Sequence, residues 1–480
     1  MTKLNTLADW LGERLPELIA EHRVPGAVIG VYANGEHLER AAGVLNTRTG
    51  VPVTTDSLFQ IGSVSKVWTA TLALQLVEDG KLDLDLPIRA YLPEFRLADE
   101  SAATLITTRH LLCHTAGFEG DRFTDTGRGD GAIARYVELL GEAPQLFEPG
   151  ELFSYNNAGY VVIGRIIETL RGRPYIQCLR EHLIQPLELA HTATDAEEAI
   201  LHRAAVGHFP SGPEGSPQPA GVWALPRSLA PAGSALTMSA RDLLTFARGR
   251  LSDDGGVLGA EAIHAMRPEH SRVPPVTAHG DTWALGWEIF HVGGHTIYGH
   301  NGDTIGQSAF LRLLPERDIA VALLTNGGEG VLLHHRLLGH VLRELAGIEL
   351  PALPVPSPGT IDASRYLGGY GNSVADITIS QDGSGAIWAE QVPAGEYAGF
   401  APPQRFQLLP YHGDTLITAQ PNQGVHRLLT FLGDDGHGKA RFLHDGRALP
   451  RRSDAPRPPA PILGGGSRTA GQPTTGGVSW

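Results

Sequence analysis

The sequence contains very little lysine. Only four of its 38 basic residues are lysine, at positions 3, 66, 81 and 439. Three of them have polar or turn-like surroundings, whereas Lys66 lies in the apolar segment 61–77. An arginine would be hard to bury there because its guanidinium stays charged, whereas a lysine amine can lose its proton. The position of Lys66 therefore indicates an amine that works in its neutral form.

Cysteine and long apolar runs are also scarce. The two cysteines, Cys113 and Cys178, are too few for a disulfide framework, so we expect reduced, buried thiols. No apolar run reaches the roughly 18 residues that a membrane-spanning helix needs. The formal net charge of -14 argues against nucleic-acid and anionic-membrane partners.

The first residues do not have the apolar core of a signal peptide. Residues 1–15 carry acidic side chains, and leucines recur at helical spacing at positions 4, 7, 11, 15 and 18. This pattern predicts an amphipathic helix and favours a cytoplasmic protein.

Ser63 precedes Lys66 by three residues. In a helix the two side chains share a face, and Ser63 in the first turn has backbone N–H groups without helical partners beside it. This arrangement provides a hydroxyl nucleophile, an amine to take its proton, and donors for a developing oxyanion. Taken alone, Ser-x-x-Lys is equally typical of a capped helix whose lysine extends to solvent.

Two further motifs support the catalytic interpretation. Tyr155-Asn-Asn157 precedes the apolar run 160–167, and His300-Asn-Gly302 precedes the strand-like segment 307–314. Both patterns also occur elsewhere in the chain. Tyr-x-Asn recurs at 370–372 in a glycine-rich stretch and His-x-Gly at 291–293 in a hairpin-like turn, and we interpret both repeats as structural.

In this order, the three motifs resemble those of the serine β-lactamase and penicillin-binding-protein superfamily, on its class C side. The flanking segments 110–118, 153–160 and 299–306 are similar to segments common there, and the resemblance covers roughly residues 10–347. The third motif departs from the usual Lys-Thr-Gly, because His300 replaces the lysine that helps to hold a β-lactam carboxylate. The resemblance therefore implies poor β-lactam hydrolysis and favours the D-aminopeptidase, D-peptidase and esterase-like branches.

The resemblance implies a role for each motif residue. Ser63 would attack a carbonyl, with Lys66 as the base kept neutral by desolvation. Tyr155 would return the proton to the leaving group and titrate together with Lys66. Asn157 has the amide groups to orient Lys66 or a substrate amide.

The third motif would complete the site. By analogy with the family, the backbone N–H groups of Ser63 and Asp303 form the oxyanion hole, and Gly302 lets substrate approach the strand closely. His300 would either hold a substrate carboxylate or bond to Tyr155. No metal, nucleotide or prosthetic group is required.

Other histidines are expected to be structural. His110 and His114 have the spacing of a metal pair, but no glutamate follows His110 as a zinc-protease motif requires. His334 and His335 lie in the helix-like segment 331–344. We expect them to be exposed on that helix or to pack against a neighbouring element.

We expect an α/β (α+β) protein with two folded parts. Residues 1–348 would form a β-lactamase-like domain, with early and late strands in one antiparallel sheet, flanking helices, and a mostly helical insert at 83–240. Asn34-Gly35 predicts a hairpin, and Ser239–Asp242 a helix-starting capping box. A Pro-rich linker at 349–361 would lead to a small all-β, lipocalin-like barrel at 362–450 and a disordered tail at 451–480.

The expected activity is that of a serine hydrolase or acyltransferase on a small peptide amide, ester or thioester that contains D-amino acids. The alternative is a penicillin-binding-protein-type thioesterase that cyclises nonribosomal peptides. Such enzymes are free-standing and carry a lipocalin-like C-terminal domain. A β-lactamase or a non-catalytic binder fits the residues less well. The sequence leaves open the oligomeric state and whether water or an amine accepts the acyl group.

Overall fold

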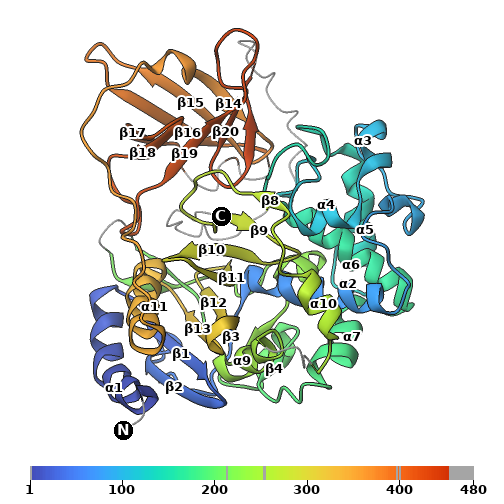
Figure 1. The fold of residues 1–480 in the computed structure, drawn as a ribbon, viewed down its shortest axis with the longest axis vertical. Helices are drawn as coiled ribbons and strands as arrows, with labels where there is room; N and C mark the ends of the chain where they lie inside the picture. The colour runs from blue at the N-terminus through green and yellow to red at the C-terminus, as the bar shows by residue number, and fades with distance from the viewer. Residues whose placement is uncertain (1–2, 212–214, 252–255, 396–397, 399–401, 453–480) are drawn as a thin grey trace. The chain divides into compact units, whose positions relative to one another are not determined.

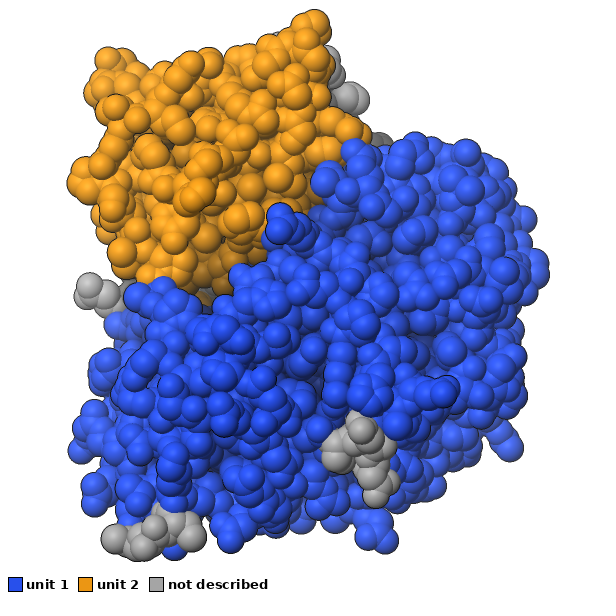
Figure 2. All heavy atoms as spheres, in the orientation of Figure 1, with its two compact units in different colours: residues 1–210, 215–273, 278–352 blue, residues 211–214, 274–277, 353–480 orange. Residues whose placement is uncertain are grey.

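The computed structural model describes residues 3–211, 215–251, 256–395, 398 and 402–452 of the 480-residue chain. It divides into two compact units, shown in different colours in Figure 2. Unit 1 comprises Met1–Pro210, Gly215–Val273 and Ala278–Ala352, and unit 2 comprises Ser211–Glu214, Pro274–Thr277 and Leu353–Trp480. The division at residue 352 falls inside the predicted linker. The predicted disordered tail lies, from residue 453 onward, outside the described residues.

Unit 1 contains an antiparallel sheet of eight strands in the order β2-β1-β13-β12-β11-β10-β9-β8 (Figure 1). The first two strands, β1 (Gly26–Ala33) and β2 (Glu36–Gly43), form the predicted hairpin. The other six come from late in the chain: β8 (Ser271–Arg272), β9 (Thr282–Trp283), β10 (Glu288–Val292), β11 (His295–Asp303), β12 (Ser308–Leu314) and β13 (Ile319–Thr325). The predicted union of early and late strands in one sheet is confirmed.

Both faces of this sheet are covered. Along β13, Ile319, Val321 and Leu323 belong to one core cluster, and the alternating Ala320, Ala322 and Leu324 to another. This is the period of two that a strand buried on both faces shows. The first cluster lies under α1 (Lys3–Glu21) and α11 (Gly330–Ala346). The N-terminal helix is amphipathic as predicted and buries leucines 7, 11, 15 and 18.

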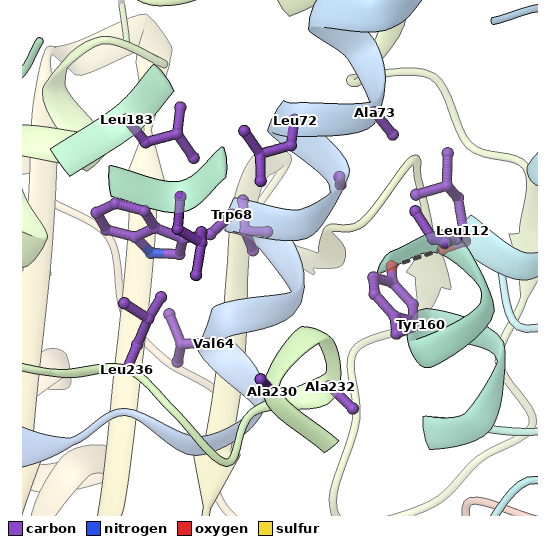
Figure 3. Close-up of a cluster of buried hydrophobic side chains, with 14 of the residues drawn as sticks. Val64, Trp68, Leu72, Ala73, Leu112, Tyr160, Leu183, Ala230, Ala232 and Leu236 are labelled. Carbon is purple, nitrogen blue, oxygen red and sulfur yellow. Dashed lines mark hydrogen bonds between the residues drawn. The ribbon is translucent and has the colours of Figure 1, made fainter. Parts of the chain in front are cut away.

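The second face packs against α9 (Ala240–Arg248), and the core cluster on this side includes α2 (Ser65–Glu78), which is apolar around most of its circumference. A helix of this kind must lie inside the protein. Figure 3 shows its Trp68 and Leu72 among apolar side chains, and Trp68 also stacks on Phe246 at 3.9 Å between ring centroids. In the same region, the Tyr160 hydroxyl donates to the carbonyl oxygen of Leu112 at 3.0 Å.

The insert between the early and late strands is mainly helical, as predicted. Its α-helices are α3 (Glu100–Leu105), α4 (Thr108–Leu112), α5 (Ala132–Leu139), α6 (Asn157–Arg171), α7 (Tyr175–Leu179), α8 (Ala196–Ala199) and α9 (Ala240–Arg248), with α10 (Ala260–Ala265) following. It also contains strands that the sequence did not reveal. They are β7 (Thr237–Met238), which pairs with β4 (Thr192–Ala193) on one side and with the earlier β3 (Phe59–Gln60) on the other, and the pair β5 (His208–Pro210) and β6 (Pro217–Pro219).

The predicted capping box before α9 is half correct. The Ser239 side chain accepts a hydrogen bond of 3.2 Å from the backbone nitrogen of Asp242, as an N-cap does. The Asp242 carboxylate does not return to Ser239. It accepts instead from the backbone nitrogen of His191 at 2.7 Å and from Thr192 Oγ1 at 2.8 Å, and thereby ties α9 to β4.

Unit 2 is a nearly closed barrel of eight antiparallel strands in sequential order. Its strands are β14 (Gly368–Gly371), β15 (Ala375–Gln381), β16 (Ile387–Pro393), β17 (Gln404–His412), β18 (Thr415–Thr418), β19 (Leu428–Leu432), β20 (Phe442–His444) and β21 (Ala448–Pro450). A bridge between Tyr370 and Arg451 brings the two ends of the sheet together. Tyr370, of the second Tyr-x-Asn pattern, is fully buried in this barrel and is structural, as interpreted.

Both cysteines are buried and unpaired. Burial raises the pKa of the Cys113 thiol to about 12 and that of Cys178 to about 11. Among the residues that the structure describes, no helix has the length and apolarity to cross a bilayer.

Candidate active site

Ser63 lies at the entrance to α2. It occupies a short 3-10 turn, Gly62–Val64, and the α-helix itself begins at Ser65, so the serine precedes the first turn in which we had expected it. Gly62 has φ +50°, a backbone conformation that favours glycine. This turn sets the Ser63 hydroxyl directly against the side chain of Lys66.

The amine of Lys66 is fully buried, and its hydrogen-bond partners include Ser63, Asn157 and Ala232. Its Nζ lies 3.0 Å from Ser63 Oγ, 2.7 Å from Asn157 Oδ1 and 2.6 Å from the carbonyl oxygen of Ala232. The amide and carbonyl oxygens can only accept, whereas the serine hydroxyl can also donate. An ammonium can donate to all three oxygens, whereas the neutral amine expected of a base would keep two N–H groups on the two carbonyl-type oxygens and turn its lone pair to Ser63.

Asn157 is held in a fixed orientation by a residue that carries no sequence motif. Its Nδ2 donates to Asp121 Oδ1 at 2.7 Å, which leaves Oδ1 to face Lys66. Asn157 begins α6, and the neighbouring Asn156 caps that helix by accepting from Gly159 N at 2.7 Å. Asp121 lies in an irregular segment, and nothing in the sequence distinguished it from the other acids there.

Tyr155 is buried in a group of aromatic rings, with 5% of its surface exposed. Lys66 Nζ lies 4.8 Å from the centroid of its ring, and the rings of His114 and His279 lie 4.3 and 4.9 Å away. Trp283 approaches edge-on at 5.7 Å. The amine of Lys66 thus lies against the ring of Tyr155, as the proton transfer expected between them requires.

His110 and His114 do not form a metal pair. His110 Nδ1 accepts from Thr107 N in the capping box of α4, and His114 Nδ1 accepts from Asn156 N at 2.9 Å. His114 nevertheless belongs to the site, because its ring packs on Tyr155. Its place in the family-like segment 110–118 was the available signal. In the described part of the chain, no group of three or more potential ligands could hold a metal ion.

The third motif lies on β11. His300 is 1% exposed, and its Nδ1 lies 2.5 Å from the carbonyl oxygen of Asn301, to which it can only donate. Burial lowers the pKa of His300 to about 4, with the charge of Lys66 acting in the same direction and that of Glu288 opposing it. His300 is thus neutral at pH 7. A buried, neutral imidazole does not suit the first of the two roles expected for it, holding a substrate carboxylate.

Gly302 brings β11 against the nucleophile. A Cβ at this position would lie 2.0 Å from the carbonyl oxygen of Ile61 and 3.0 Å from the backbone nitrogen of Ser63. A Cβ on Gly62 would likewise lie 2.8 Å from the nitrogen of Asp303. The backbone nitrogens expected to form the oxyanion hole are therefore in adjacent backbone segments. Only glycine lets these segments come so close.

Glu288, on β10, is the main residue of this region that we did not predict. It is fully buried, and its carboxylate accepts from the backbone nitrogens of Asn301 and Gly280, each at 3.1 Å. Its Oε1 lies 3.6 Å from His300 Nδ1 and 3.9 Å from His279 Nδ1. A single acid in the otherwise apolar segment 287–292 was the signal for it.

The structure thus brings Ser63, Lys66 and Asn157 into direct contact and places Tyr155, His300, Gly302 and Asp303 around them. Comparison with known proteins agrees with this arrangement. The model of the protein family described as Beta-lactamase matches residues 11–342 of the chain. The chain belongs to the β-lactamase family. It is a serine hydrolase of the branch that includes the penicillin-binding proteins.

Its relatives within the family have several activities. "Penicillin-binding protein 4" of Amycolatopsis lactamdurans is 41% identical over 379 residues, which cover 76% of this chain and 97% of the relative. SurE, also solved with D-Leu, has a TM-score of 0.76 and 31% identity over 93% of this chain and 100% of SurE. The D-amino acid amidase of Ochrobactrum anthropi SV3, solved with D-phenylalanine, has a TM-score of 0.59 and 25% identity over 67% of this chain and 92% of the amidase. The individual roles of the site residues remain predictions.

Proposed function

We propose that the chain acts on peptide amides, esters or thioesters that contain a D-amino acid, through an acyl-Ser63 intermediate. The observation that carries this proposal is the contact of Lys66, whose buried amine lies 3.0 Å from Ser63 Oγ while two carbonyl-type oxygens occupy its N–H groups. The D-configuration is supported by the likeness to an enzyme named as a D-amino acid amidase and to SurE, which was solved with D-Leu.

In the first half of the reaction, Ser63 Oγ forms a bond to the substrate carbonyl carbon as its proton passes to Lys66 Nζ. The backbone N–H groups of Ser63 and Asp303 stabilise the oxyanion. The bond to the leaving group then breaks, and the leaving group takes a proton from the Lys66–Tyr155 pair. In the second half, water or an amine attacks the carbonyl carbon of the acyl-Ser63 ester and transfers a proton to the same pair. The bond to Ser63 Oγ then breaks, the pair returns a proton to Oγ, and the acyl group leaves as an acid or an amide.

The second candidate is a thioesterase whose acyl acceptor is the amine of the peptide itself. The observation that favours it is the domain plan. A barrel of eight antiparallel strands follows the hydrolase unit, and the likeness to SurE extends over 93% of the chain and so includes that barrel. The difference between the candidates lies in the acceptor alone, since both form acyl-Ser63.

Two experiments test the proposal. A fluorophosphonate should label the wild-type protein on Ser63, read by mass spectrometry, and Ser63→Ala should show background labelling. Equal labelling of both proteins would count against the acyl-enzyme. A panel of peptidyl thioesters with a D- or an L-residue at the acyl end then separates the candidates. Linear acid indicates hydrolysis and macrolactam indicates cyclisation, and exclusively linear product would defeat the cyclase.

A further inference from the structure

The loop between β8 and β9 brings a histidine against the ring of Tyr155. His279 stacks on that ring, with 4.9 Å between the centroids and 20° between the planes. The His279 side chain is 9% exposed, and its Nδ1 lies 3.9 Å from Glu288 Oε1, which is too far for a hydrogen bond. The contact with Tyr155 is therefore made by the face of the imidazole and not by one of its nitrogens.

Asn301, the middle residue of the third motif, holds the backbone just before His279. Its Nδ2 donates to the carbonyl oxygen of Ala278 at 3.0 Å, and its Oδ1 accepts from Arg312 Nη2 at 2.6 Å. Because a guanidinium can only donate, the amide must turn its oxygen to Arg312 and its nitrogen to Ala278. Arg312 thus fixes the Asn301 amide, and the amide in turn fixes the loop.

The backbone just after His279 is also held. Gly280 N donates to Glu288 Oε2 at 3.1 Å. A Cβ at residue 280 would lie 2.5 Å from the carbonyl oxygen of Ile289, so the loop passes directly against β10. Since both of its neighbours are fastened to strands of the sheet, His279 has little freedom to move, and its ring is a rigid support.

Tyr155 belongs to a different part of unit 1. It lies in the segment that leads into α6, whose N-cap is Asn156, within the helical insert. The stack with His279 therefore ties the Tyr155 ring to the sheet that carries the third motif. A phenol that returns a proton to the leaving group must be held accurately, because a misplacement of about 1 Å can lower the rate about a hundredfold.

We propose that His279 is a positioning residue for Tyr155 and that Asn301 acts through it. The Asn301 amide fastens the loop, and the imidazole face holds the phenol where it can protonate the leaving group. This inference rests on the proposed acyl-Ser63 chemistry and assigns a role in it to the middle residue of the third motif.

The arrangement makes a selective prediction for acylation. As Ser63 Oγ bonds to the carbonyl carbon and the bond to the leaving group breaks, an alcohol needs a proton, because an alkoxide is too basic to leave alone. A thiol, whose pKa is about 8.5, can leave as the thiolate. Displacing the Tyr155 phenol should therefore slow an ester more than a thioester, whereas general damage to the fold would slow both alike.

A matched pair of substrates tests this. N-acetyl-D-phenylalanine is offered as its ethyl ester and as its N-acetylcysteamine thioester, which form the same acyl-enzyme, and kcat/KM reports the acylation step. His279→Ala should lower kcat/KM about 10- to 100-fold for the ester and about threefold or less for the thioester. His279→Phe keeps a flat ring and should restore most of the ester activity. His291→Ala, which removes a more exposed histidine paired with Glu269 at 3.0 Å, should change neither value.

The role of Asn301 is tested by a double-mutant cycle. Asn301→Ala should show the same selective loss on the ester, and the double variant with His279→Ala should lose little more, because the two residues act in series. Thermal unfolding would verify that each variant is folded. The proposal is overturned if ester and thioester fall equally in His279→Ala, if His279→Phe is as slow as His279→Ala, or if the two single losses multiply.

The same assay separates this inference from the function on which it rests. Turnover of the thioester by the wild type supports acyl-Ser63 chemistry whatever the variants do. A wild type that turns over the thioester but not the ester would overturn the inference alone, because no proton then reaches the leaving group. Failure to turn over either substrate would overturn both.

Discussion

The carboxylate of Asp121 lies 2.7 Å from the side-chain nitrogen of Asn157. Because that nitrogen must donate, the amide oxygen of Asn157 is directed to Lys66 Nζ, also at 2.7 Å. A continuous series of hydrogen bonds thus connects Asp121 to Ser63 through Asn157 and Lys66. Asp121 positions the base without touching the nucleophile.

Removing Asp121 should impair the site without dismantling it. In Asp121→Ala, nothing holds the Asn157 amide in one orientation, and losing one charge-assisted hydrogen bond corresponds to about tenfold in kcat/KM. Asp130→Ala is the control, because Asp130 is an exposed acid of the same irregular segment, 3.7 Å from Arg227. It should keep kcat/KM within about twofold. Equal values for the two variants would show that Asn157 needs no such support.

The proposed proton-transfer unit predicts a non-additive pattern. Ser63→Ala, Lys66→Ala and Tyr155→Phe should each lower kcat at least about a thousandfold, and the double variants should lose little more. The matched control is Lys81→Ala, an exposed lysine that pairs with Asp79 at 3.1 Å, and it should retain activity. Thermal unfolding would verify that each variant is folded. Losses that multiply in the double variants would contradict a single unit.

Stability should fall on acidification because His300 is buried in its neutral form. Its pKa is about 4 in the folded chain, and an unfolded histidine has a pKa of about 6.5. Between these values the unfolded chain binds a proton that the folded chain does not, so the free energy of unfolding decreases as the pH falls. Over the full window the decrease approaches about 3 kcal/mol.

Replacing the imidazole should remove this part of the pH dependence. The Tm of His300→Gln should fall less than that of the wild type between pH 6.5 and pH 5. Glu288, whose pKa lies below its ordinary value, contributes in the same direction but at lower pH, so it leaves this comparison largely unaffected. His202→Gln, at an exposed site, should behave as the wild type does. Parallel curves for wild type and His300→Gln would show that the imidazole is not the titrating group.

The sequence revealed those parts of the fold that follow from local pattern. The Asn34-Gly35 hairpin, the leucine row of α1 and the three motifs all have spacings with a direct geometric meaning, and the structure has each of these elements. Lys66 stood out because lysine is rare and its segment is apolar. These features depend on neighbours that are close in the chain.

The remainder depends on contacts between distant segments. Asp121 matters because it binds Asn157, which lies 36 residues away along the chain. Glu288 likewise accepts a hydrogen bond from the backbone of Asn301 on the next strand. The carboxylate of Asp242 accepts hydrogen bonds from His191 N and Thr192 Oγ1, about 50 residues away, instead of from its expected capping partner. No local pattern encodes such partners, so single-sequence reasoning could not find them.

Gly302 provides the sharpest steric test of the site. A Cβ there would lie 2.0 Å from the carbonyl oxygen of Ile61, and that oxygen belongs to backbone that cannot swing aside. Gly302→Ala should therefore push β11 away from the Ser63 turn, at a cost to folding of about 1–3 kcal/mol. Moving Asp303 N away from Ser63 should also slow fluorophosphonate labelling by about a hundredfold or more.

The control for this variant is Gly221→Ala, because a Cβ at Gly221 would meet nothing within 4 Å. Labelling rate and Tm should both match the wild type there. A Gly302→Ala variant with a lowered Tm but a normal labelling rate would show that the loss of stability does not affect the reactivity of Ser63. Asp303 N would then not be part of the oxyanion hole. The expected result is that both fall together, because the close approach of Gly302 to the Ser63 turn, where an added Cβ would lie 3.0 Å from Ser63 N, both holds the strand in place and aligns the two N–H groups.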